Sequence, residues 1–312
     1  MFSHRYLHAA TKVLDGMPKG SSSLWCTRAT KGYGLLPVAR DARSLTEAIP
    51  AFDYSANDIA LARRFRSNFY ERILSPREIP IALQYAPISL DIEIYDSVWS
   101  DHSGVLTLPD DENKKEDLDH TVTVYGHDEY GLEIGIGWSN WGNKGRGFIP
   151  YEYLEKYFIT AFVLSALYKI GKNPQKELSR KRKKIKESKW YEHTYAVPSM
   201  RNDKRPLFNI EIYTIGGLLS GWIHFAHNQN RSVEVLDLFV LPEYRRRGIG
   251  TYLLQESQAL LRTATITGFI TGYDLGEREE IVKDFLLSNN LVPYVDTSQF
   301  RDCRFRIGRL DS

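Results

Sequence analysis

The chain has 312 residues, 42% of them hydrophobic and 26% charged, which predicts a soluble globular protein of about two domains. Its formal net charge of +2 is too near neutral to favour a nucleic-acid partner, and the dense basic run at 172–189 has no interleaved aromatic residues for base stacking. The two cysteines, Cys26 and Cys303, lie far apart without a CxxC spacing, so we expect neither a disulfide framework nor a metal site.

No membrane segment or secretory signal is expected. The first residues lack an uninterrupted apolar run, and the most apolar stretch, 157–170, is too short to span a bilayer. These features predict a cytoplasmic protein without a membrane partner.

Along the first half of the chain, the pattern predicts a mixture of helices and strands. Residues 80–99 begin as a helix and alternate as a strand from Ile88, and residues 20–23 form a short loop. Further helices are expected at 2–14, at 55–74 with Ser55 as the cap, and at 157–170, and strands at 120–125 and 131–138.

Beyond the basic run, strands outnumber helices. The pattern predicts a mixed α/β unit of about 120 residues. Its strands are expected at 207–214, 218–226, 233–241, 266–274 and 303–310, and its helices at 251–262 and 277–288.

A glycine-containing turn links the strand at 233–241 to the helix that follows. Gly248 and Gly250 allow close approach of the backbone, and a helix N-terminus offers unpaired N–H groups and a partial positive charge. Arg245, Arg246 and Arg247 add charge for a polyanion. The turn is therefore suited to a pyrophosphate.

Arg245, Gly248 and Gly250 form the pattern Arg-x-x-Gly-x-Gly, and here the sequence resembles the GNAT N-acetyltransferases over roughly 191–310. The resemblance implies acetyl-CoA as the acyl donor, with an amine as acceptor and no metal. It places the pyrophosphate on the turn amides and the pantetheine arm along the preceding strand, which usually splays from its neighbour at a bulge. The implied cofactor residues are Leu238, Phe239, Val240, Arg245, Arg246, Arg247, Gly248, Ile249, Gly250 and Thr251.

The transfer also needs a base, because an alkylamine is mostly protonated near neutral pH. Glu234, which lies 14 residues before Gly248, matches the glutamate base of some lysine-acetylating GNATs, and Asp237 is the second candidate. The tyrosine that protonates the thiolate in many GNATs aligns with Leu286, so Tyr294 or Tyr273 would have to replace it. Little room remains for the two helices that usually wall the acceptor site, which leaves the site open or completed by the first domain.

The first half resembles a truncated papain-like cysteine peptidase over Phe2 to about Leu154. His120 matches the catalytic histidine, and the glycine-rich end matches at Trp141, Gly142, Gly145, Gly147, Ile149, Pro150, Tyr151 and Tyr153. The sequence pattern of this half is most similar to that of bacterial papain-like peptidases.

The peptidase machinery is incomplete. In the alignment to the family, the helix that carries the nucleophile would precede residue 1, and the sequence around Cys26 does not match the nucleophile motif. The orienting asparagine aligns with Ile136, while Asn140 is out of register. Either the domain is a pseudopeptidase that keeps a peptide cleft, or the nucleophile lies outside this chain.

Together the resemblances predict an α+β chain in three parts. A papain-like domain at 1–155 lacks the nucleophile helix, a helical and basic linker follows at 156–190, and a GNAT-type domain at 191–312 has a central, mostly antiparallel sheet. The leading hypothesis is an acetyl-CoA-dependent N-acetyltransferase whose first domain presents a peptide or protein amine. The alternatives are an acyl-CoA-binding pseudoenzyme and a cysteine peptidase.

Overall fold

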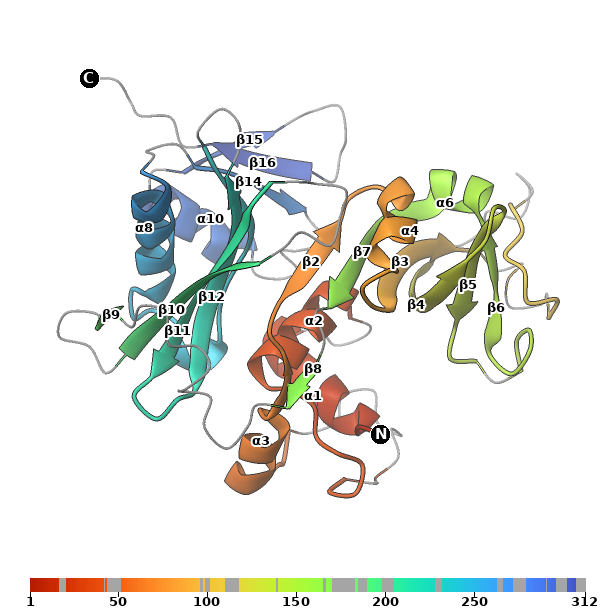
Figure 1. Ribbon diagram of the computed structural model, residues 1–312, viewed down its shortest axis with the longest axis horizontal. Helices are drawn as coiled ribbons and strands as arrows, with labels where there is room; N and C mark the ends of the chain where they lie inside the picture. Colours follow the sequence, from red (N-terminus) through yellow and green to blue (C-terminus); the bar gives the residue numbers. More distant parts are fainter. Residues whose placement is uncertain are drawn as a thin grey trace.

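The computed structural model contains two large β-sheets, one from each half of the chain, with helix α2 (Ser23–Gly32) between them (Figure 1). Within the described ranges, no helix is both long enough and apolar enough to cross a membrane. The structure describes residues 1–16, 21–41, 43, 52–95, 98, 102–109, 118–138, 140–164, 167–169, 183–184, 190–197, 205–227, 232–262, 266–271, 279–289, 291–295 and 302–306.

The first sheet is antiparallel throughout and has six strands. The strands expected from Ile88, at 120–125 and from Gly131 are confirmed, and their apolar side chains form the core of this half. In spatial order the strands are β2 (Tyr70–Ile73), β7 (Phe158–Leu164), β3 (Ile88–Ile94), β4 (Leu118–His127), β5 (Gly131–Gly135) and β6 (Arg146–Pro150).

The helix predicted at 157–170 is wrong. A short helix, α6 (Tyr151–Tyr157), ends where β7 begins, and β7 pairs with β2 on one side and β3 on the other. Residues 160–163 are buried on both faces of the sheet. A central strand of this kind reads as a continuous apolar run without alternation, so its periodicity resembles that of a buried helix.

The helix predicted at 55–74 is correct only at its start. Ser55 caps α3 (Ala56–Ala62) by accepting a hydrogen bond from the amide of Asp58. The chain then forms β1 (Phe65–Ser67) and β2, because pairing with β7 satisfies the backbone of β2 and buries its side chains. Strand pairing that is distant in sequence therefore overrides the local helical spacing.

The remaining described elements of the first half are helices and one short strand. Helix α1 (His4–Asp15) confirms the helix expected at 2–14, with Ser3 as its cap and Gly16 in the left-handed conformation at its end. Helix α2 begins inside the segment predicted as a loop. Many of its buried residues are polar, so the sequence shows no clear apolar face there. The others are η1 (Pro76–Glu78), α4 (Ile79–Ala82) and β8 (Leu167–Lys169), which pairs with β1.

The second sheet has eight strands and is mostly antiparallel, as predicted; among the described pairings only β13 and β14 run parallel. The helices expected after the glycine turn and at 277–288 are α8 (Ile249–Leu261) and α10 (Glu279–Ser288). In spatial order the strands are β15 (Val292–Val295), β16 (Asp302–Arg306), β14 (Ile266–Thr271), β13 (Val233–Val240), β12 (Leu219–His227), β11 (Leu207–Thr214), β10 (Trp190–Val197) and β9 (Lys183–Lys184). Most of the basic run at 172–189 lies outside the described residues.

The two faces of this sheet differ in chemistry. Helices α8 and α10 cover an apolar face, whose buried side chains include Ile210, Ile223, Phe225, Val233 and Val235. The opposite face carries polar and charged side chains on β11, β12 and β13, and it is buried as well. Helix α2 and strand β2 from the first half of the chain lie against that polar face.

Two buried ion pairs join α2 to the polar face. Arg28 lies 2.5 Å from Asp237, and Lys31 lies 2.5 Å from Glu211. The Lys31 and Glu211 side chains are 0% and 2% exposed, so each charge depends on the other for compensation. Burial lowers the pKa of Lys31, while Lys31 and Arg66 outweigh burial at Glu211 and hold the pKa of that carboxyl below its usual value.

Lys31→Met should destabilise the protein by about 3 kcal/mol, because it leaves the Glu211 carboxylate buried without its main counter-charge. Adding Glu211→Gln in the same chain should recover part of that loss. The midpoint of urea unfolding measures both effects. Arg40→Met, which removes a pair whose arginine is 54% exposed, is the control and should barely move the midpoint. A Lys31→Met protein as stable as the wild type would contradict this role for the pair.

Candidate functional site

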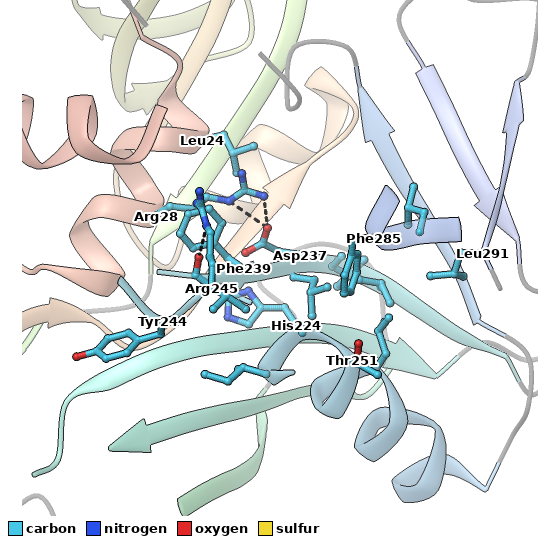
Figure 2. Close-up of a pocket in the computed structure, with 18 of the residues that line it drawn as sticks. Leu24, Arg28, His224, Asp237, Phe239, Tyr244, Arg245, Thr251, Phe285 and Leu291 are labelled. Atoms are coloured by element: carbon cyan, nitrogen blue, oxygen red, sulfur yellow. Dashed lines mark hydrogen bonds and ion pairs between the residues drawn. The ribbon is translucent and has the colours of Figure 1, made fainter. Parts of the chain in front are cut away.

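A cavity of about 680 Å³ lies between the second sheet and the first half of the chain (Figure 2). Its lining comes from α2, β2 and β7 on one side, and from β12, β13, the glycine turn, α8 and α10 on the other. This volume is typical of sites for small molecules and cofactors. The cavity is therefore built jointly by both halves of the chain.

Strand β13 lines the cavity, and its pairing with the parallel strand β14 ends part-way along its length. It pairs with β14 only from Val233 to Val235. Its pairing with β12 shifts register next to Leu236, where the strand carries an extra residue. Among the described residues, no strand pairs with Leu236 to Val240 on the side where β14 pairs with Val233 to Val235, so backbone groups along that edge can bind a ligand.

The turn after β13 gathers backbone N–H groups at the opposite end of the cavity. Arg246 (φ 57°) and Gly248 (φ 77°) adopt the left-handed conformation, which turns successive amides to one side. Gly248 provides no side-chain cap for α8, and the first helical hydrogen bond runs from the amide of Tyr252 to the carbonyl of Gly248 (2.9 Å). The amides of residues 249–251 thus have no intrahelical partner, which is an arrangement that favours an anion.

The space beside the turn is open on one side and closed on the other. A Cβ atom at Gly248 would meet nothing within 4 Å, whereas a Cβ atom at Gly250 would lie 2.9 Å from the ring of Phe285. Glycine at position 250 therefore lets α10 pack closely against the start of α8. Leu286 and Leu291 extend this apolar wall of the cavity.

The arginines of the turn have separate positions. Arg245 donates a hydrogen bond to the carbonyl of Val240 (3.0 Å), and its guanidinium lies 5.4 Å from the Phe239 ring centre. Arg245 and Arg246 line the cavity, while Arg247 lies near Trp190 and is not among the lining residues. Apart from Arg247, every residue that the sequence predicts for cofactor binding lines the cavity.

Asp237, the second candidate base, is the centre of a hydrogen-bonded cluster. Its carboxylate accepts hydrogen bonds from Arg28, from the hydroxyl of Tyr70 and from the indole of Trp222 (2.7 Å). Burial alone would raise the pKa of Asp237, but the charge of Arg28 and the hydrogen bonds to the carboxylate together outweigh burial and hold the pKa below its usual value. The carboxylate is ionised and its oxygens are already occupied.

Glu234, the first candidate base, lies on the same strand but outside the lining of the cavity. Its carboxylate accepts a hydrogen bond from Arg205, and both side chains are about a quarter exposed. The backbone of Tyr294 lies in β15, its side chain is outside the described residues, and so is Tyr273. Leu286 at the expected tyrosine position is a buried lining residue. The catalytic roles assigned from the sequence stay predictions.

His224 on β12 also lines the cavity, and the sequence analysis did not select it. The residue is 1% exposed, and its Nε2 atom has no hydrogen-bond partner in the part of the chain that the structure describes. Its ring lies against Phe69 (4.5 Å between centres) and Tyr70 (4.8 Å). A histidine two residues after Trp222, within a mostly apolar strand, is the signal that could have found it.

The electrostatic surroundings keep this imidazole neutral. Burial lowers the pKa of His224 well below 6.5 and Lys31 and Arg28 lower it further, while Asp237 and Glu211 only partly oppose them. A neutral imidazole has one nitrogen that can accept a proton.

The residues singled out in the first half lie elsewhere. His120 on β4 stacks on Trp138 (4.6 Å between ring centres), and its Nε2 is 3.4 Å from the carbonyl oxygen of Ile136. Burial lowers the pKa of His120 and raises the pKa of the Cys26 thiol to about 11. In the described residues, the sulfur of Cys26 is hydrogen-bonded only to Thr11, so it lacks the base that would make a reactive thiolate.

No group of three or more His, Cys, Asp or Glu side chains in the described ranges is arranged to hold a metal ion. The cavity offers backbone donors, arginines and the imidazole of His224, and its lining also includes carboxylate and hydroxyl residues such as Asp237, Glu71 and Tyr70.

Comparison with known proteins places a family on part of this structure. Residues 175–274 match the model of the acetyltransferase (GNAT) family, a stretch that includes β10 to β14 and α8. No curated protein matches the chain. The matched stretch includes the glycine turn together with β13 and α8, which line the cavity.

The comparison with solved structures finds acetyltransferases. They include nourseothricin acetyltransferase (17% identity, 32% of this chain and 64% of that one, TM-score 0.27). A streptothricin acetyltransferase of Bacillus anthracis in complex with acetyl coenzyme A has 13% identity, with 34% and 64% covered and a TM-score of 0.28. The PaiA N-acetyltransferase of Thermoplasma acidophilum, in complex with coenzyme A, has 16% identity, with 32% and 59% covered and a TM-score of 0.27. The match thus spans less than two thirds of each of these proteins.

The imidazole of His224 should remain neutral on acidification from pH 7 to pH 6, since its pKa is held well below 6.5. The ¹⁵N shifts of the histidine rings, followed by NMR over this range, measure its charge. The spectrum of a His224→Gln variant, which lacks one ring, assigns the signals. A His224 ring that protonates around pH 6.5 would contradict the environment described above.

Proposed function

We propose that the protein is an N-acetyltransferase that moves an acetyl group from acetyl-CoA to an amine. The observation that carries the proposal is the cavity, which joins the open edge of β13 to the uncapped start of α8. The GNAT match at 175–274 covers both of these elements. The cavity offers a different kind of contact at each of these two places. The turn provides amides that can bind an anion, and the strand from Leu236 onward provides backbone groups that do not pair with β14.

Each part of acetyl-CoA has a matching part of the cavity. The amides of 249–251 and the guanidiniums of Arg245 and Arg246 suit the pyrophosphate. The open edge at 236–240 suits the amides of the pantetheine arm, which would pair with it like an added strand. A backbone N–H on this edge would then stabilise the negative oxygen that develops on the thioester carbonyl during attack.

The acceptor amine would enter from the side formed by the first half of the chain. Trp25, Tyr70 and Phe162 line the cavity there and close the polar face of the sheet. This arrangement supports the possibility left open by the sequence, that the first domain completes the acceptor site. The wall is mainly aromatic, which suits the apolar part of a peptide side chain or of a small amine.

We propose further that the first half is a non-proteolytic papain-like scaffold. The alignment from the sequence matches His120 to the catalytic histidine and Ile136 to the orienting asparagine, and the contact between these two residues supports it. The raised thiol pKa of Cys26, whose sulfur is hydrogen-bonded to Thr11, is unsuited to peptide hydrolysis. Its role would be to hold the acceptor.

A second candidate function is an acyl-CoA-binding module without turnover. Two observations favour it: Leu286 stands where many GNATs have the proton-donating tyrosine, and Glu234 lies outside the lining of the cavity. Release of free CoA thiol from acetyl-CoA in the presence of amines separates the two functions, because a binding module releases none.

Acetyl-CoA should bind the wild-type protein, and Arg246→Glu should weaken binding at least about tenfold, since it replaces an attractive charge at the cavity by a repulsive one. Arg247→Glu is the matched control, because that neighbouring arginine is also exposed but does not line the cavity. Isothermal titration calorimetry measures both affinities.

Gly250→Trp should abolish binding, because the indole would fill the space at the start of α8. The melting temperature of that variant shows whether the fold survives its contact with Phe285. Wild-type protein that does not bind acetyl-CoA would overturn the transferase and the binding module together. If the two charge reversals weaken binding equally, the pyrophosphate does not bind at this turn.

A further inference from the structure

We propose that His224 is the group that takes the proton from the acceptor amine and returns it to the CoA thiolate. This inference rests on the proposed function and deepens it. The sequence analysis assigned these two tasks to Glu234 or Asp237 and to a tyrosine, whereas the structure brings one suitable side chain to the cavity.

The geometry of His224 is that of a proton carrier. Nε2 is buried, has no hydrogen-bond partner in the described part of the chain, and belongs to a ring that lines the cavity. An unpaired polar atom at such depth costs stability, so its retention calls for an explanation. A ligand that supplies the missing partner provides one.

The neighbours of His224 fix its ring rather than compete for its proton. Phe69 and Tyr70, both from the first half of the chain, pack against it. Asp237, the residue opposite His224 on β13, is already occupied by Arg28, Tyr70 and Trp222. The first half of the chain therefore orients the ring directly.

Charged groups face His224 from each element packed around it. They are Arg28 and Lys31 on α2, Glu211 on β11, Asp237 on β13 and the phenol of Tyr70 on β2. The two cations and burial favour the neutral ring, and the two carboxylates would stabilise the imidazolium that forms for a short time during the reaction. The ring can thus accept a proton and release it again.

The step balances without any further reactant. The neutral amine nitrogen attacks the thioester carbon, a C–N bond forms, and the carbonyl electron pair moves to oxygen. The amine proton passes to Nε2 of His224, directly or through one water. The C–S bond then breaks as the carbonyl reforms, and the imidazolium gives the proton to the thiolate sulfur, so free CoA and the amide leave together.

The other groups near the cavity are less suited. Leu286 carries no proton, and the Asp237 carboxylate already accepts hydrogen bonds from Arg28, Tyr70 and Trp222. Burial and the adjacent Asp237 raise the pKa of Tyr70 well above 10, so its hydroxyl is a poor acid. Glu234 is paired with Arg205 and lies outside the cavity lining.

The test uses the full chain, acetyl-CoA and two small amine probes, hydroxylamine and n-butylamine, and it measures thiol release. His224→Gln should bind acetyl-CoA as the wild type does but lower kcat about a hundredfold or more. His227→Gln is the matched control, because it changes a histidine of the same strand that does not line the cavity. It should leave the rate unchanged.

A His224→Ala variant with added imidazole separates a chemical role from a structural one. Imidazole should restore part of the rate in His224→Ala and have no effect on His227→Ala. The acid limb of the wild-type profile of kcat against pH should lie below pH 6.5 and should be absent in His224→Gln, since the ring must be neutral to accept the proton.

The outcomes separate this proposal from the one on which it rests. One outcome contradicts only the role of His224. In that outcome acetyl-CoA binds, the wild type releases thiol, and His224→Gln is as active as the wild type with the same pH profile. The proposed transferase function then stands. If acetyl-CoA binds but the wild type releases no thiol with either amine, the transfer itself fails, and the role of His224 fails with it. Absence of acetyl-CoA binding overturns both.

Discussion

The buried ion pairs between α2 and the polar face of the second sheet are the constraint on which the rest of the structure depends. Arg28 and Lys31 reach across from the first half of the chain to Asp237 and Glu211. Buried charges are costly unless they are paired, so these side chains fix how the two halves meet. The contact is specific because a shifted α2 would leave charges on both sides without partners.

That contact also creates the cavity. On its polar side, the sheet alone would present the open edge of β13 to solvent. Helix α2 and strand β2 cover this side and leave a cavity of about 680 Å³. The same elements hold the ring of His224 through Phe69 and Tyr70 and hold the carboxylate of Asp237 through Arg28. In this account the two halves form one functional unit, with the donor held mainly by the second half and the acceptor side closed by the first.

How much of this could be predicted from the sequence depends on how local each feature is. The turn from Arg245 to Thr251 was predictable, since its glycines, arginines and following helix are neighbours in the chain and their geometry is local. The face that carries Asn209, Glu211 and Tyr213 was not, because alternating polar residues normally indicate a solvated face and only the tertiary structure buries this one. Strand β7 was mistaken for a helix for a related reason, since burial on both faces removes the alternation. The importance of His224 likewise comes from contacts with residues far away in the chain.

Hydrogen–deuterium exchange with and without acetyl-CoA tests the central claim most directly, because it reports on both halves of the chain in one experiment. The account predicts slower exchange on addition of acetyl-CoA in peptides that cover 236–240 and 245–251, and also in peptides from α2, which walls the same cavity. Exchange in β4 and β5, which contribute no lining residue, should not change. Protection confined to β4 and β5, or none at 245–251, would contradict an acyl-CoA site between the two halves.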